Sequence, residues 1–96
     1  MPNFTGGVKL EFEGSVITEQ GVTFAIVVVK RHVIDNRIEA DELIQSFRMR
    51  VFEGMPVILM AQDSRGIPTY YGRDDIVKFL ASIHPGRIPW KKYRLD

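Results

Sequence analysis

The sequence contains no cysteine among its 96 residues. Disulfide bonds, thiolate metal ligands, thiol nucleophiles and dithiol redox chemistry are therefore excluded. A chain without cysteine suits a reducing compartment. The first residues, MPNFTGG, also lack the basic start and apolar run of a secretory signal. We therefore expect a cytoplasmic protein.

Long hydrophobic runs are absent as well. The longest uninterrupted apolar stretch, FAIVVV, has six residues, whereas a helix needs about 20 to cross a bilayer. We therefore expect no contact with a membrane. The composition, 45% hydrophobic and 26% charged, predicts a single domain spanning residues 1–96. We expect residues 1–6 to form a flexible N-terminus.

Motifs for catalysis or metal binding are scarce. His32 and His84 have no histidine or acidic residue at metal-ligand spacing. The acidic pairs Asp41–Glu42 and Asp74–Asp75 are helix neighbours whose side chains point about 100° apart, which is unsuitable for general acid–base catalysis. No nucleophile-elbow or phosphate-loop motif occurs. We therefore predict no enzyme activity, no cofactor and no bound metal, and a small enzyme whose site is assembled only by the fold is a third alternative.

The first half of the chain predicts a hairpin followed by a helix. Residues 8–13 alternate apolar and polar side chains, as in a half-buried strand, and Gly21 can adopt the positive φ of a hairpin turn. The run from Val22 to Ile34 begins with β-branched residues and predicts a central strand. Asn36 and Glu39 form a capping box at the start of a helix. The apolar stripe of that helix contains Ala40, Leu43, Ile44, Phe47 and Val51.

The second half follows the same order of hairpin and helix. Residues 57–61 form a continuous apolar run, which predicts a strand buried on both faces, and Asp63–Gly66 predicts the turn. Because Pro68 has no N–H to donate, we expect the return strand at residues 67–71 to lie at a sheet edge. A second helix is predicted from Asp74 to Ile83, with two acidic residues in its first turn.

The segment from Pro56 to Ile83 resembles the closing strand, hairpin and helix of thioredoxin-like domains. In that family a cis-proline precedes the first of these strands, at the position that Pro56 has here. The N-terminal hairpin departs from the family order, and the family's cysteine pair is absent. The resemblance therefore implies a local arrangement of strands and helix, and it implies no redox function.

These elements together predict an α+β domain with the order β-β-α-β-β-α. We expect a mostly antiparallel four-stranded sheet with two helices packed on one face. Residues 85–96 then form a basic aromatic C-terminal tail outside this core.

The charge of this tail is the most unusual feature of the sequence. Residues 1–83 contain nine Lys or Arg against eleven Asp or Glu, whereas residues 84–96 contain four against one. Trp90 and Tyr93 alternate with these basic residues, which is a composition suited to single-stranded nucleic acid. The tail can equally pack its apolar side chains over the sheet while its charged groups stay in water.

We therefore predict a non-catalytic binding module that contacts a protein partner, or a second copy in a homodimer, through an edge strand and the tail. The alternative is weak, non-specific binding of single-stranded nucleic acid, aided by Lys30, Arg31, Arg48 and Arg50. Both hypotheses use the same expected contact residues. These are Tyr70, Tyr71, Arg87, Trp90, Lys91, Lys92, Tyr93 and Arg94.

Overall fold

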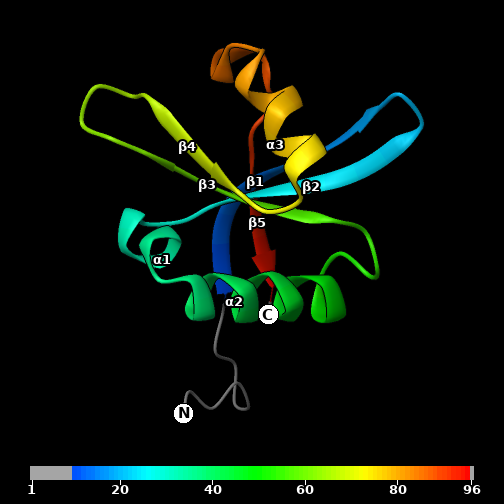
Figure 1. The fold of residues 1–96 in the computed structure, drawn as a ribbon. Coiled ribbons are helices and arrows are strands. Elements are labelled where there is room, and N and C mark those ends of the chain that lie inside the picture. The colour runs from blue at the N-terminus through cyan, green and yellow to red at the C-terminus, as the bar shows by residue number, and fades with distance from the viewer. Residues whose placement is uncertain (1–9, 96) are drawn as a thin grey trace.

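One sheet separates two helical layers in the computed structural model, which describes residues 10–95 (Figure 1). The elements in chain order are β1 (Leu10–Glu19), β2 (Val22–Val28), α1 (Arg31–Asp35), α2 (Arg37–Arg50), β3 (Val57–Gln62), β4 (Pro68–Tyr71), α3 (Asp74–Ala81), the 3₁₀ turn η1 (Pro85–Arg87) and β5 (Lys91–Leu95). The predicted flexible N-terminus, residues 1–6, lies outside the described residues, as do Val8 and Lys9 of the first predicted strand.

The sheet has five strands in the order β4-β3-β2-β1-β5. The predicted α+β class is confirmed, and three of the four strand pairings are antiparallel. The β2–β3 pair is parallel, and such a pair needs a crossover, which α2 provides. The prediction of four strands is wrong, because part of the C-terminal tail forms β5 and gives the order β-β-α-β-β-α-β.

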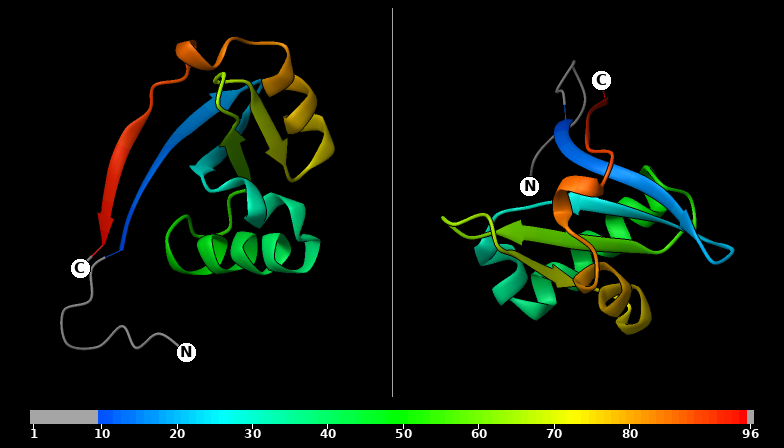
Figure 2. Two further views of the ribbon diagram at one scale, coloured as in Figure 1. Left: turned by 90° about the vertical axis from the view of Figure 1, so that its left-hand side faces the viewer. Right: turned by 90° about the horizontal axis from the view of Figure 1, so that it is seen from above.

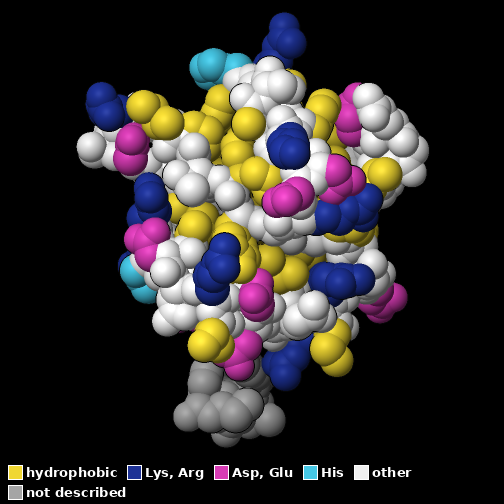
Figure 3. Space-filling model, in the orientation of Figure 1, with side chains coloured by type: hydrophobic (Ala, Val, Ile, Leu, Met, Phe, Trp, Pro, Cys, Tyr) yellow, Lys and Arg dark blue, Asp and Glu magenta, His cyan; other side chains and the backbone are white. Residues whose placement is uncertain are grey.

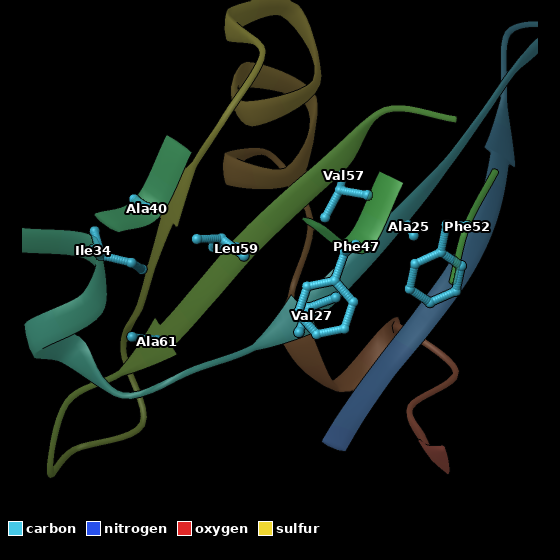
Figure 4. Close-up of a cluster of buried hydrophobic side chains, with 9 residues drawn as sticks. All are labelled: Ala25, Val27, Ile34, Ala40, Phe47, Phe52, Val57, Leu59 and Ala61. Carbon is cyan, nitrogen blue, oxygen red and sulfur yellow. The ribbon is translucent and has the colours of Figure 1, made fainter. Parts of the chain in front are cut away.

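The two main helices cover opposite faces of the sheet, so the prediction that both pack on one face is wrong (Figure 1). On the α2 side, Ala40 and Phe47 pack on strand residues of β2 and β3 such as Val27 and Leu59 (Figure 4). On the α3 side, Ile76 and Leu80 pack on the alternate strand residues, which are Phe24, Ile26, Ile58 and Met60. The reason is that β2 and β3 carry apolar side chains on both faces, and each face needs a cover.

Local sequence signals predict most of the residues at which helices and strands begin or end. The Asn36 side chain accepts a hydrogen bond from the Glu39 N–H at 3.1 Å, which confirms the predicted helix start. Gln20 and Gly21 have φ of 50° and 78°, as in a two-residue hairpin turn. The predicted strand from Val22 to Ile34 is wrong beyond Val28, because the chain turns into the short helix α1. In α1 the side chain of Ile34 is buried against the α2-side core.

The thioredoxin-like resemblance holds only for the order of the elements. β3, β4 and α3 follow one another as the resemblance implies. The cis-proline expected at Pro56 is not found, because residues 10–95 contain no cis peptide bond.

Gly14 divides β1 into two halves with different neighbours. Residues 10–14 pair with β5 and residues 14–19 pair with β2. Residues 10–14 and β5 therefore form a two-stranded arm that extends away from the rest of the sheet (Figure 2). A Cβ atom at Gly14 would lie 2.5 Å from the backbone oxygen of Ile26. This close approach explains why glycine stands at the division between the two halves.

Candidate interaction surface

Among the described strands, β5 is an edge strand with one side paired and one side open. It pairs antiparallel with β1 in a register that places Glu11 opposite Arg94, Phe12 opposite Tyr93 and Glu13 opposite Lys92. β5 is the last strand in the sheet order, so within residues 10–95 its other edge has no strand neighbour. Unpaired N–H and C=O groups of such an edge are a template for another strand.

An aromatic cluster attaches β5 to the α2 side of the domain. The Tyr93 ring stacks on Phe12 with 5.0 Å between ring centroids and 4° between ring planes. Phe12 also makes an edge-to-face contact with Phe47 at 4.9 Å, and Phe52 packs edge-on against Tyr93 at 5.6 Å. We name Phe12, Phe47, Phe52 and Tyr93 the aromatic cluster. Because the Tyr93 ring already has a stacking partner, one face of it is unavailable to a nucleic acid base.

The opposite face of the arm formed by β1 and β5 carries charges of both signs. Arg94 Nε lies 3.5 Å from Glu11 Oε2, and Lys92 is opposite Glu13 in the register. All four side chains belong to exposed residues, so each pairing contributes at most about 1 kcal/mol to stability. The acidic residues of β1 therefore offset part of the positive charge that the sequence places in the tail.

The segment that leads into β5 is docked on the α3 side of the sheet. Ile88 is 4% exposed and packs with Leu80 and Ile76. The buried Ser15 hydroxyl donates to the Pro89 carbonyl at 3.0 Å. Trp90 is half-buried, and its Nε1–H donates to the Pro85 carbonyl at 3.0 Å. Ile88 and Trp90 thus pack on the α3 side of the sheet, as expected for a tail that packs on the domain, whereas residues 91–95 join the sheet as β5.

The docked tail predicts the fluorescence of the only tryptophan. We expect the emission of Trp90 to be blue-shifted relative to the unfolded chain, and its quenching by iodide or acrylamide to be reduced, because the indole is half-buried among apolar neighbours. The measurement compares native and denatured protein in the same buffer. An emission maximum and a quenching constant equal to those of the denatured chain would contradict the docked arrangement.

A groove of about 600 Å³ lies between the β3–β4 hairpin and the segment from His84 to Trp90. Figure 3 shows hydrophobic side chains exposed between the hairpin and the end of α3. The groove is lined by Glu13, Met60, Gln62, Arg65, Gly66, Ile67, Pro68, His84, Pro85, Gly86 and Trp90. Its volume is in the range of ligand pockets, which is about 300–1,000 Å³. Of the contact residues expected from the sequence, only Trp90 lines it.

Tyr70 and Tyr71 lie on β4, the other outer strand, and face opposite sides of the sheet. Tyr71 Oη donates to Asp41 Oδ1 at 2.8 Å, and this hydrogen bond raises the pKa of the Tyr71 phenol. Burial raises the pKa of Tyr70. The two tyrosines and β5 are therefore at different edges and do not form one continuous edge.

The remaining basic residues are dispersed. Arg87 is exposed in η1. Arg31 pairs with Asp35 at 3.2 Å, and Arg48 donates to the Gly54 carbonyl at 3.3 Å. These contacts compete with the phosphate contacts that the nucleic acid hypothesis requires.

The residues of β1 that pair with the tail were not predicted from the sequence as contact residues. Glu11, Phe12 and Glu13 were predicted only as part of a half-buried strand. A signal was present in the two alternating patterns, because acidic–aromatic–acidic in residues 11–13 complements basic–aromatic–basic in residues 92–94. In an antiparallel pair, this complementarity places opposite charges across from each other.

Across the described range, 10–95, no group of three or more His, Asp or Glu side chains is placed to hold a metal ion. In the same part of the chain, no helix is both long enough and apolar enough to cross a membrane. Comparisons of the chain with protein families, curated proteins and solved structures found no match.

Proposed function

We propose that the protein is a non-catalytic binding module that takes an extended segment of a partner protein as an additional strand along β5. The observation that supports this proposal most directly is that β5 pairs with β1 along one edge and, within residues 10–95, has no strand neighbour along the other. Main-chain hydrogen bonds to such an edge supply affinity, and the side chains on the two faces supply specificity.

The β5 edge is better suited to strand addition than the β4 edge. β4 has four residues and begins with Pro68, which cannot donate a backbone hydrogen bond. β5 has five residues and no proline. The aromatic cluster also packs β5 against the domain. Because β5 is already ordered before a partner strand binds, binding does not lose the conformational entropy of β5.

A partner protein is a better occupant than a second copy of this chain. If two β5 strands paired antiparallel about Tyr93, Lys92 of one copy would lie opposite Arg94 of the other. Pairings centred on Lys92 or on Arg94 would place identical cations opposite each other. Like charges directly opposite in a sheet are destabilising, and edge lysines are a common means of preventing strand association between copies.

The test is strand protection by a selected peptide. Peptides are selected from a random library on the immobilised protein, and amide exchange of β5 is followed by NMR with and without each binder. We expect the outward-facing amides of β5 to gain protection on binding, because they acquire hydrogen-bond acceptors. Binders that leave β5 exchange unchanged and alter only the groove residues would contradict the proposal.

Two proline variants provide the matched control. N–H groups of neighbouring strand residues point to opposite edges, so Lys91→Pro and Lys92→Pro remove donors from different sides of β5. The variant that removes an N–H pointing to β1 loses a bond to β1 and serves as the control. The variant that removes an N–H pointing to the open edge should retain native Trp90 fluorescence, and its peptide affinity should fall roughly fivefold to tenfold. Unchanged affinity in both variants would contradict strand addition.

A further inference from the structure

We infer that the segment added to β5 alternates acidic and apolar residues. The inference rests on the proposed function and specifies the partner of that same edge. It follows from the side chains that β5 presents on each face and from the strand that already pairs with it.

β1 shows which sequence pattern complements β5. Glu11 and Glu13 are opposite Arg94 and Lys92, and Phe12 is opposite Tyr93 between them. The acidic side chains lie on one face of the arm, where Glu11 contacts Arg94. The aromatic side chain lies on the other face and stacks on Tyr93. An acidic–apolar–acidic order therefore fits both faces of β5 at once.

The open edge of β5 presents the same side chains to an added strand. Residues of a strand on that edge lie opposite the same β5 residues and share their faces. Residues 91–95 contain three basic residues and no acidic residue, and all three basic side chains are exposed. Acidic residues opposite Lys92 and Arg94 would meet opposite charge, whereas basic residues there would meet like charge.

The apolar positions of the partner are specified by the other face. Tyr93 and Leu95 are only half-buried by the domain. The Lys91 ammonium lies over the Tyr93 ring at 4.9 Å. An apolar side chain opposite Tyr93 would cover the ring surface that the aromatic cluster and the Lys91 ammonium leave exposed, and it would gain the contact energy of a cross-strand aromatic pair.

Two synthetic peptides of about eight residues, the length of an ordinary strand, test the inference. The acidic probe repeats the order Leu-Glu-Phe-Glu found at residues 10–13. The basic probe has lysine in place of each glutamate. Both are titrated into isotope-labelled protein, and β5 amide shifts give the affinity. We expect the acidic probe to bind roughly tenfold more tightly than the basic probe at low salt. At about 1 M salt the difference should shrink, because charges are then screened beyond about 3 Å.

A charge reversal in the protein should reverse the preference. In Lys92→Glu we expect the acidic probe to weaken and the basic probe to strengthen. Lys92→Gln, which creates no like-charge contact with Glu13, should bind the two probes more nearly equally. Lys78→Glu is the matched control, because Lys78 is an exposed residue of α3 away from β5 and the change in net charge is identical. The control should retain the wild-type preference.

The outcomes separate the inference from the proposed function. If both probes shift β5 amides with equal affinity, the charge pattern is overturned and strand addition stands. If neither probe shifts β5 amides at millimolar concentration while library binders do, the acidic–apolar pattern is overturned alone. If neither probes nor library binders reach β5, the proposed function is overturned as well. Shifts of β1 amides together with the inward-facing β5 amides would show that the probe displaces β1, which also overturns the inference.

Discussion

Gly14→Val is expected to destabilise the domain by about 3 kcal/mol, a value at the upper end for overpacking in a buried site. A Cβ atom at this position would approach the Ile26 backbone oxygen to 2.5 Å. That oxygen belongs to β2, in the middle of the sheet, and cannot move aside as a flexible side chain would. Because Gly14 pairs with both Val27 and Lys91, any displacement of its backbone weakens two strand pairings together.

Thermal and chemical unfolding followed by circular dichroism and Trp90 fluorescence measure this effect. For a domain of this size, 3 kcal/mol corresponds to a decrease in Tm of roughly 12 °C or more. Gly14→Ala should show a smaller decrease in the same direction, because alanine adds only the Cβ atom. Val16→Thr is the control on the same strand, since Val16 is exposed and such changes shift stability by less than about 0.5 kcal/mol. Wild-type stability in both glycine variants would show that β1 and β2 separate easily at this point.

The local sequence predicts most of the elements because their signals are contained in short windows. The cap at Asn36, the turn at Gly21 and the continuous apolar run of β3 each follow from neighbouring residues. The position of α3 opposite α2 was also implied, because apolar side chains on both faces of β3 require two covering layers. The prediction of two helices on one face ignored that requirement.

The fifth strand could not be predicted in the same way. β5 pairs with residues 10–14, at the other end of the chain, and no local window contains both partners. From Lys92 to Leu95 its residues alternate basic and apolar side chains, which suits a flexible tail as well as an exposed edge strand. Only comparison of residues 11–13 with residues 92–94 reveals matched charges and matched aromatic rings. Because β1 is far from β5 along the chain, the sequence did not show which sheet edge the tail joins. The tail and the Tyr70–Tyr71 edge were therefore predicted to form one contact surface, although they belong to different edges.

The second large effect is expected for Phe12→Ala, which should destabilise the domain by about 2–3 kcal/mol. Phe12 contacts all three other members of the aromatic cluster. It is partly exposed, so the loss should fall below the range of about 3–5 kcal/mol typical of a fully buried phenylalanine. Tyr93 loses its stacking partner, and we therefore expect β5 amides to exchange faster than those of β2 or β3. Denaturant unfolding and NMR amide exchange measure the two effects separately.

A double-mutant cycle tests whether Phe12 acts through Tyr93. If the stack holds β5 on the domain, Phe12→Ala and Tyr93→Ala should be coupled by about 0.5–1.5 kcal/mol. Phe12→Leu retains apolar volume without the ring, so its free energy of unfolding should lie between that of the wild type and that of Phe12→Ala. Independent effects of the two alanine substitutions would mean that backbone pairing with β1 holds β5 without the stack. Since the proposed partner strand needs an ordered β5 edge, peptide binding should weaken in Phe12→Ala even under conditions where the domain remains folded.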